Sequence, residues 1–217
     1  MKLWLAAIAS LLVIPAAYAT PAWTFTSAGN SYTNGSWAFG TAFTVNSDVT
    51  ASGLGYYADP VTGNVNGNTV GLYQCADVAC STTGTLLAQV NVTNTYALND
   101  FFRYVTINPI NLTAGTSYEV VGVSLSDNYT WNDPGFTVNP AISLISDGNG
   151  NTTRWTSGTS LTFLNSIQND LTNQDGYWGP NVFLGQPTFA SVPEPASFAV
   201  VGFGLAALGL VRRRRRA

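Results

Sequence analysis

The stretch Ser117-Tyr-Glu-Val-Val-Gly-Val-Ser-Leu125 decides the fold. Successive side chains of a β-strand point to opposite faces, so Val121, Val123 and Leu125 fall on one side of this stretch. The turn signal Thr113-Ala114-Gly115 stands before it. Apolar alternation that follows a turn signal is typical of a strand with a buried face. The fold then depends on how many similar segments can pair with this strand.

Several other segments alternate in the same way. Asn34-Gly35 and Asp147-Gly148 are among the turn signals that separate them. Gly53 and Gly55 indicate a bulge in the second segment. We expect strands over residues 37–45, 49–57, 69–75, 85–92, 101–107, 117–125, 141–145, 160–164 and 181–184. In 85–92 the residues expected on one face are Leu86, Ala88, Val90 and Val92.

The number of short strands indicates the fold class. A short helix over residues 164–171 is the only helical candidate in the body of the chain. Many short strands separated by turn signals predict an all-β fold, an antiparallel β-sandwich that is jelly-roll-like, over residues 20–190.

Composition narrows the class of partner. Residues 20–190 carry nine aspartates and one glutamate against Arg103 and Arg154, a balance of −8 that the C-terminal arginines hide in the whole-chain value of −3. The chain has no histidine, and its one lysine is Lys2. Two cations cannot neutralise a row of phosphates, which argues against a nucleic-acid partner.

Cys75 and Cys80 are the two cysteines of the chain. In an oxidising compartment a local disulfide is the expected state. Closing so small a loop stabilises the fold by ~2 kcal/mol on the chain-entropy model. The alternative is a metal or redox pair, although no histidine or second cysteine pair is present to complete such a site.

The N-terminus has the pattern of a secretory signal peptide over residues 1–19. Met1-Lys2 is a basic start, residues 3–14 are an apolar core, and Ala17-Tyr18-Ala19 is a cleavage site of the A-x-A type. The mature chain would then begin at Thr20. A buried N-terminal helix is the alternative.

The C-terminal segment, residues 191–217, has three parts. Pro193, Glu194 and Pro195 form a rigid break, because proline fixes φ near −65°. Residues 196–211 are apolar, and a helix over these 16 residues would be ~24 Å long, short for a bilayer core of about 30 Å. The arginines that follow stay in the cytoplasm and stop the membrane segment: Arg212, Arg213, Arg214, Arg215 and Arg216. We expect a single transmembrane helix with the body on the outer side, and a plain tail anchor is the alternative.

This order of parts resembles the PEP-CTERM protein-sorting signal of Gram-negative bacteria, which is also named an ice-binding protein C-terminal domain. The Pro-Glu-Pro signature, the Gly-Leu-Ala-Ala-Leu-Gly-Leu run at 204–210 and the arginine cluster carry the resemblance, over residues 192–217. It implies that exosortase, a membrane-embedded enzyme, recognises the tail and cleaves near Pro193–Pro195. It also implies export by a bacterium that makes exopolysaccharide. The resemblance identifies a destination and no activity.

The body is similar to the uncharacterised DUF4082-type β-sandwich often found before this sorting signal. The motifs that carry this similarity include Gly55-Tyr56-Tyr57, Val70-Gly71-Leu72-Tyr73 and Tyr177-Trp178-Gly179-Pro180-Asn181. They are turn and core patterns, so the similarity implies the fold and no chemistry.

The sequence contains few residues that are suited to catalysis. Without histidine, the usual nucleophilic triads and catalytic zinc sites lack a base or a ligand. A carboxylate-based glycan hydrolase remains an alternative, because two acids placed across a sugar suffice. The available acids are Asp127, Asp133, Asp147, Asp170 and Asp175, and most lie beside Gly, Asn or Pro, where Asp commonly forms turns.

Binding has more support in the sequence. Trp131, Trp155 and Trp178 lie in stretches that are both polar and aromatic, and they are the candidate glycan-binding residues. The alternative is that these rings close the ends of the sandwich. Residues 147–151 offer oxygen ligands at alternate positions, as a Ca²⁺ loop does, but they lack the terminal glutamate of an EF-hand. An ordinary turn is the other interpretation, so we assign no metal site and no cofactor.

These observations predict a non-enzymatic exported protein that is a substrate of exosortase. It would be anchored transiently in the inner membrane and would then reside at the cell surface or in the extracellular matrix, associated with exopolysaccharide. A carbohydrate-binding module is the alternative function, and a glycan hydrolase is a third.

Overall fold

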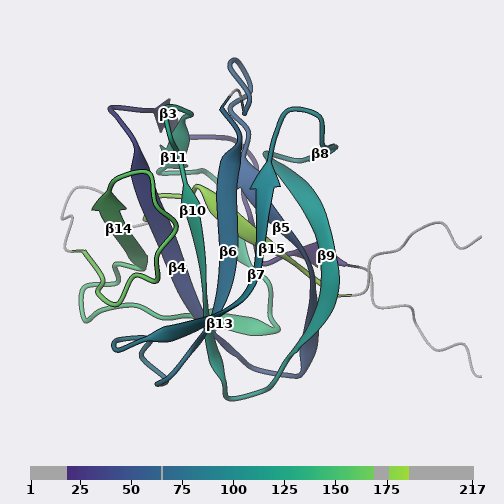
Figure 1. The fold of residues 1–217 in the computed structure, drawn as a ribbon, viewed down its shortest axis with the longest axis vertical. Coiled ribbons are helices and arrows are strands. Elements are labelled where there is room, and N and C mark those ends of the chain that lie inside the picture. Colours follow the sequence, from purple (N-terminus) through teal and green to yellow (C-terminus); the bar gives the residue numbers. More distant parts are fainter. Residues whose placement is uncertain (1–18, 65, 169–175, 186–217) are drawn as a thin grey trace, which may run out of the picture. The chain divides into compact units, whose positions relative to one another are not determined.

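A computed structural model describes residues 19–64, 66–168 and 176–185 (Figure 1). The expected signal sequence up to residue 18, the Pro-Glu-Pro break, the apolar tail segment and the arginine cluster lie outside the described residues. All regular structure within the described ranges is β-strand, so the predicted all-β class is confirmed. No helix in these ranges has the length and apolar character that a membrane crossing requires.

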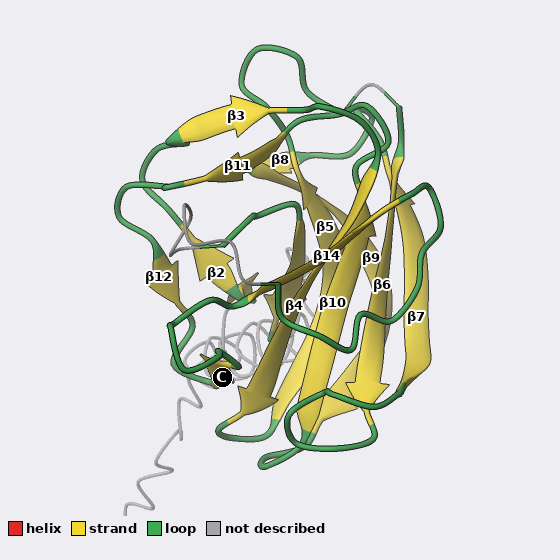
Figure 2. Ribbon diagram, turned by 90° about the vertical axis from the view of Figure 1, so that its left-hand side faces the viewer, coloured by secondary structure: helices red, strands yellow, loops and turns green. Residues whose placement is uncertain are grey.

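Two larger antiparallel sheets face each other (Figure 1). The first has the order β1 (Thr20–Pro21), β15 (Pro180–Leu184), β5 (Val49–Tyr57), β9 (Phe102–Leu112) and β8 (Leu98–Asn99). The second has the order β13 (Ile142–Leu144), β4 (Trp37–Val45), β10 (Ser117–Val123), β6 (Asn68–Cys75) and β7 (Gly84–Val92), and β14 (Thr153–Ser157) also pairs with β4. Two small ladders pair β3 (Asn30–Tyr32) with β11 (Tyr129–Trp131), and β2 (Trp23–Thr24) with β12 (Thr137–Val138) (Figure 2).

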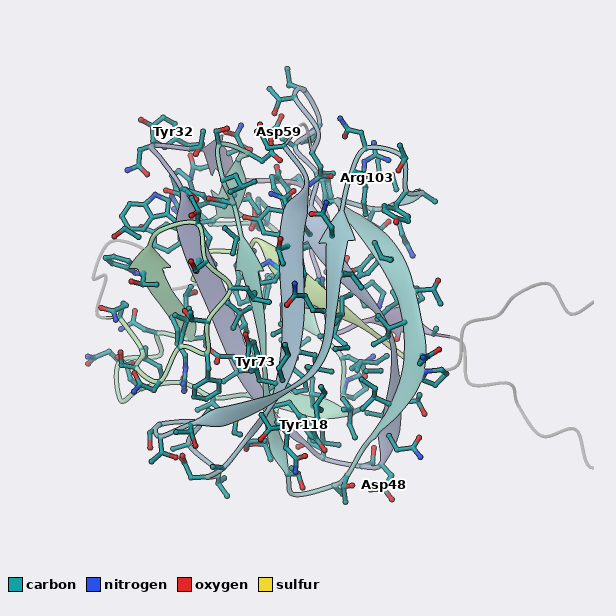
Figure 3. The ribbon with its side chains drawn as sticks, viewed as in Figure 1. Tyr32, Asp48, Asp59, Tyr73, Arg103 and Tyr118 are labelled. Atoms are coloured by element: carbon teal, nitrogen blue, oxygen red, sulfur yellow. A yellow bond between two sulfur atoms is a disulfide. The ribbon has the colours of Figure 1, made fainter. Side chains whose placement is uncertain are left out.

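The decisive strand, β10, lies in the middle of the second sheet and is buried on both faces. It pairs with β4 on one side and with β6 on the other. Tyr118 and Val120 point into the core between the two sheets, whereas Val121 and Val123 point to the opposite face. Figure 3 labels Tyr118 and also Tyr73 of β6, which belongs to the outer set. The expected strand is confirmed over residues 117–123, and its valine face is the outer one.

Residues 158–168 cover that outer face. The side chains of Leu161 and Leu164 pack there, with Phe163 beside them. Backbone glycines of the sheet make room for them: a Cβ at Gly71 would lie 2.7 Å from Leu161, and one at Gly84 would meet the ring of Phe163. We call this covering segment the strap.

The strap corrects two predictions. The strand expected over residues 160–164 is not formed, and residues 164–168 are not helical, while the rest of the expected helix lies outside the described residues. The apolar alternation of Leu161 and Phe163 is real, but these side chains pack on the face of a sheet and the backbone pairs with no strand edge. An alternating pattern predicts burial of one face and does not by itself provide a pairing partner.

Two bulges bear on the other predicted strands: one changes the face on which a side chain lies, and the other was expected. An extra residue at Leu87 shifts the register between β6 and β7, so Leu86 pairs with the outward Tyr73 and is 45% exposed. Leu86 therefore leaves the face on which Ala88, Val90 and Val92 lie, because one inserted residue reverses the alternation. The bulge expected near Gly53 is present against β15, where Ser52 is the extra residue between Ala51 and Gly53.

Cys75 and Cys80 form the predicted disulfide, with their Cα atoms 5.0 Å apart. The bridge closes the loop between β6 and β7 and packs with Ala42 on the outer face of the second sheet. The strap and the disulfide loop therefore lie on the same side of the molecule.

Candidate functional site

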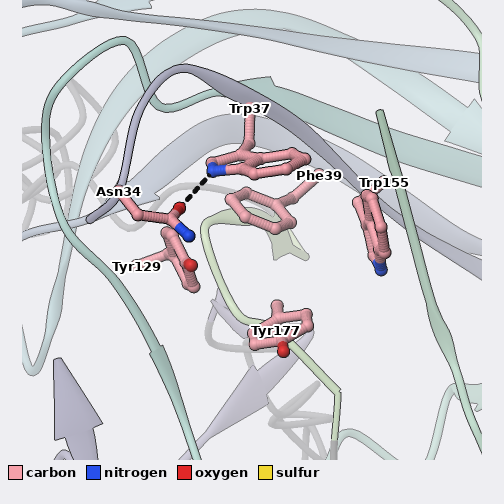
Figure 4. Close-up of a pocket in the computed structure, with 6 residues that line it drawn as sticks. All are labelled: Asn34, Trp37, Phe39, Tyr129, Trp155 and Tyr177. Atoms are coloured by element: carbon pink, nitrogen blue, oxygen red, sulfur yellow. Dashed lines mark hydrogen bonds between the residues drawn. The ribbon is translucent and has the colours of Figure 1, made fainter. Parts of the chain in front are cut away.

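Six residues line a cavity at the end of β4, and five of them are aromatic (Figure 4). Asn34 lies in the turn before β4, and Trp37 and Phe39 lie on β4 itself. The other walls come from distant parts of the chain: Tyr129 of β11, Trp155 of β14 and Tyr177. We call this the aromatic cavity, and its volume is about 190 Å³.

Backbone pairing brings these segments together. Trp155 stands opposite Phe39 in the ladder between β14 and β4. Tyr177 is held beside Tyr129 because Trp178 and Thr130 exchange backbone hydrogen bonds, with N–O distances of 2.8 and 3.2 Å. The Tyr177 amide also donates to the Thr153 hydroxyl at 2.6 Å. The cavity is thus built on strands rather than on a single loop.

The rings that line the cavity face in several directions. Trp37 and Trp155 meet edge to face, with centroids 5.2 Å apart and an interplanar angle of 89°. Tyr129 and Tyr177 meet in the same manner at 5.3 Å and 90°. Phe39 is 2% exposed and forms a buried wall. The rings line a hollow that is partly open to solvent, and they do not form one flat platform.

Polar groups at the cavity are few and uncharged. The Trp37 indole N–H donates to the Asn34 side-chain oxygen at 2.6 Å (Figure 4). The Trp155 indole nitrogen is buried and has no hydrogen-bond partner among the described residues. A buried N–H without a partner costs about 1–3 kcal/mol, so an acceptor placed there would be favourable.

The three candidate tryptophans have different positions. Trp155 lines the cavity, and Trp131 packs beside it, with its ring 5.7 Å from Tyr129 and 5.8 Å from Tyr177. Trp178 is 1% exposed and packs against Trp23 and Phe136 in the core. As a residue of an exposed glycan platform, Trp178 is therefore a wrong prediction. Its neighbour Tyr177 faces the cavity instead, because alternate residues of an extended chain point to opposite sides.

Three of the aspartates proposed for hydrolysis lie in the described part of the chain, and none of these three lines the cavity. Asp127 accepts hydrogen bonds from Asn66, and Asp133 accepts from Gly29 and Thr130 at 2.7 and 2.6 Å. Asp147 closes its own turn, accepting from the backbone N–H groups of Asn149 and Asn151. Asp170 and Asp175 lie outside the described residues. Within the described ranges no three His, Cys, Asp or Glu side chains gather as metal ligands would.

One aspartate that the sequence did not single out is Asp59, at the end of β5. Burial raises the pKa of its carboxyl, but hydrogen bonds from Ser31, Asn128, Thr62 and Val61 outweigh that effect and lower the pKa to about 2. Asp59 thus ties β3 and the loop before β11 to the end of β5. β3 and β11 form the ladder that carries Tyr129, so Asp59 supports the cavity without lining it.

Glu119 and Arg154 form a buried ion pair on the outer face of the second sheet. The Arg154 Nε atom lies 4.0 Å from Glu119 Oε1, and both side chains are at most 2% exposed. Arg154 donates to the carbonyls of Ala79 and Cys80 in the disulfide loop and to that of Leu164 in the strap. The Leu164 amide donates to Glu119 Oε2 at 3.1 Å.

The environment of this pair perturbs both groups. Burial raises the pKa of Glu119 to about 8, against the opposing influence of Arg154 and of the Leu164 N–H. Burial also lowers the pKa of Arg154, while the charge of Glu119 opposes that shift. The contacts tie the strap and the disulfide loop to the sheet. The charge of Asp77, in the disulfide loop, acts on the pKa of Arg154 in the same direction as the charge of Glu119.

Comparison with known families places a signal at the C-terminus. The PEP-CTERM protein-sorting motif matches residues 191–216, which include Pro193, Glu194, Pro195 and the arginine cluster. This motif marks an exported protein that exosortase processes, with a membrane-anchored transit followed by localisation at the surface. No curated protein matches the chain. These comparisons give no support to the DUF4082-type similarity of the body.

Proposed function

We propose that the chain is the precursor of a non-enzymatic surface or matrix protein that works within an exopolysaccharide layer. The sorting motif at residues 191–216 is the observation that carries the proposal. The apolar segment would hold the precursor in the inner membrane, with the five arginines on the cytoplasmic side. Exosortase would then cut near Pro193–Pro195 and release the β-sandwich body outside the cell.

Features of the body are consistent with that destination. The Cys75–Cys80 disulfide suits an oxidising compartment. The acidic balance of residues 20–190, with two arginines and no lysine, favours solubility and disfavours adhesion to nucleic acid.

The proposal is tested by replacing Pro193, Glu194 and Pro195 with alanine in the full chain. We expect an uncleaved precursor that stays with the membrane fraction, because the rigid break no longer presents a cleavage site. Pro187→Ala, outside the matched motif, is the control and should be processed normally. Immunoblots of membrane and medium fractions report both size and location. Normal processing of the triple variant would refute the sorting proposal.

A carbohydrate-binding function is the second candidate, and the aromatic cavity is the observation that favours it. Aromatic faces stack on the C–H faces of sugar rings, and amide and indole groups bond hydroxyls. Trp155 and Asn34 supply both kinds of contact at one place. The hydrolase candidate gains nothing from this cavity, because none of the six lining residues is a carboxylic acid.

A further inference from the structure

The aromatic cavity indicates which kind of sugar the body would bind. Building on the carbohydrate-binding candidate, we propose that the cavity takes one uncharged pyranose ring at the end of a glycan chain. Three properties of the described residues carry this inference: the size of the cavity, the angles between its rings, and the charges around it.

Size limits the occupant to about one ring. The cavity volume of about 190 Å³ is below the ~300 Å³ at which pockets for drug-sized ligands begin. Phe39 and Tyr129 are 2% and 6% exposed and wall the cavity from within. A glycan that continued in both directions would need an open groove, whereas a terminal sugar can enter such a cavity with the rest of its chain outside.

The ring angles favour enclosure over a linear platform. A surface that binds a long polysaccharide presents coplanar rings in a row, each stacking on a successive sugar. Here Trp37 and Trp155 are perpendicular, and so are Tyr129 and Tyr177. Rings packed edge to face at these distances present a mixture of faces and edges to one guest, and not a continuous platform for several.

Charge selects an uncharged sugar. None of the six lining residues is an aspartate, glutamate, lysine, arginine or histidine. The carboxylate of Asp133 accepts from Thr130, the residue that follows Tyr129. Arg154 precedes Trp155, but its guanidinium points to the opposite face of the sheet, toward Ala79, Cys80 and Leu164. A uronate or sulfated sugar would find no cation to pair with and would meet an acidic body.

One polar group would orient the sugar. The Asn34 side-chain oxygen is engaged by Trp37, which turns the amide nitrogen of Asn34 toward the cavity in Figure 4. A neutral pyranose offers both a C–H face for the rings and a hydroxyl for this donor.

The test is a titration of the exported protein with defined glycosides, followed by calorimetry and tryptophan fluorescence. The probes are the methyl glycosides of glucose, galactose and mannose, methyl glucuronoside, and neutral trisaccharides that end in the same hexoses. We expect at least one neutral methyl glycoside to bind, its trisaccharide to bind within about threefold of it, and the glucuronoside to bind at least tenfold more weakly.

Variants assign the binding to the cavity. Trp155→Ala should weaken binding by about tenfold or more, because it removes a stacking face. Trp155→Phe keeps one aromatic ring but loses the second ring of the indole and its N–H, so its loss should be smaller. Asn34→Ala tests the exposed amide without disturbing the core. Tyr96→Ala, an aromatic residue 38% exposed and not among the cavity residues, is the matched control and should bind as the parent does.

The remaining outcomes separate the inference from the function on which it rests. Preferential binding of the glucuronoside, or tight binding of trisaccharides that monosaccharides do not compete, would overturn the inference and leave carbohydrate binding intact. Binding that survives Trp155→Ala would place the sugar elsewhere and would also overturn it. Binding of no glycoside or trisaccharide would overturn both the inference and the carbohydrate-binding candidate, while processing by exosortase would be untouched.

Discussion

At the scale of single residues, Glu119 and Arg154 join the second sheet to the strap and to the disulfide loop. They are the one glutamate and one of the two arginines in residues 20–190, and both are buried in contact with three separate segments. Burying an ion pair costs desolvation energy that Coulomb attraction only partly returns, and for this reason the folded protein keeps the Glu119 carboxyl protonated up to about pH 8 beside the Arg154 guanidinium. The hydrogen bonds from Arg154 to three carbonyls supply the rest and position the strap and the disulfide loop.

The raised pKa of Glu119 predicts how stability depends on pH. Below pH 4.5 its carboxyl keeps its proton in both states, and between pH 4.5 and about 8 only the folded state does. Ionisation of the unfolded chain over this range therefore lowers the free energy of unfolding as pH rises. We expect the melting temperature to fall between pH 5 and pH 8, on the order of 5 °C.

Glu119→Gln imitates the protonated carboxyl, so its melting temperature should vary much less over the same pH range. Asp100→Asn is the control, because Asp100 is exposed and has a φ of 52° that asparagine also adopts. The pKa of Asp59, lowered to about 2, acts only as the pH falls below about 4 and does not contribute here. Melting curves followed by circular dichroism give the comparison. If the melting temperatures of the parent and of Glu119→Gln changed equally with pH, the role assigned to this carboxyl would be contradicted.

At the scale of elements, the outer face of the second sheet depends on small residues that leave room for the strap. Gly84→Ala would drive a Cβ into the ring of Phe163, which contacts both the disulfide cluster and Tyr73. We expect a loss of about 1–3 kcal/mol in the free energy of unfolding, as overpacking usually causes. Gly148→Ala is the matched control, since nothing lies within 4 Å of its Cβ position, and it should be nearly neutral. Urea unfolding measures both, and equal stability of the two variants would show that the strap yields without cost.

The strands show how far local pattern predicts the fold. The strands over residues 37–45 and 49–57 were predicted at their observed bounds, because alternation and flanking turns are local signals. The strand over 153–157 was missed, because Arg154 interrupts the apolar pattern and its partners Ala79, Cys80 and Leu164 are distant or on the strap. The strand expected over residues 101–107 continues to Leu112 through Pro109, which is tolerated because a bulge breaks the ladder beside it.

The aromatic cavity was also predictable only where the signal is local to one segment. The polar and aromatic character around Trp131 and Trp155 indicated a binding surface, and both residues do lie at or beside the cavity. The local pattern identifies Trp37 and Phe39 only as one face of a strand, and it identifies Tyr177 only as part of a turn motif. Their convergence depends on the ladder of β4 with β14 and on the bridge between Thr130 and Trp178, and neither pairing has a signal within its own segment.

For the whole molecule, the sorting motif at residues 191–216 specifies a destination, and the body presents an acidic surface. Acidic side chains are spread over the body: Figure 3 places Asp59 at one end and Asp48 at the opposite end. A body with a balance of −8 repels copies of itself and other acidic polymers at low ionic strength. A neutral glycan is the extracellular polymer with which such a surface has no electrostatic conflict.

The intact mass of the exported protein tests both cleavage sites and the Cys75–Cys80 disulfide in one measurement. Cleavage after Ala19 and near Pro193–Pro195 predicts a chain that begins at Thr20 and ends close to the Pro-Glu-Pro break. The Cys75–Cys80 disulfide lowers the mass by two hydrogens, which return on reduction. The alanine variant of the break is the control and should keep the mass of residues 196–217. A secreted parent chain that still contains these residues would contradict processing at the break, since cleavage there is what separates the body from its membrane segment.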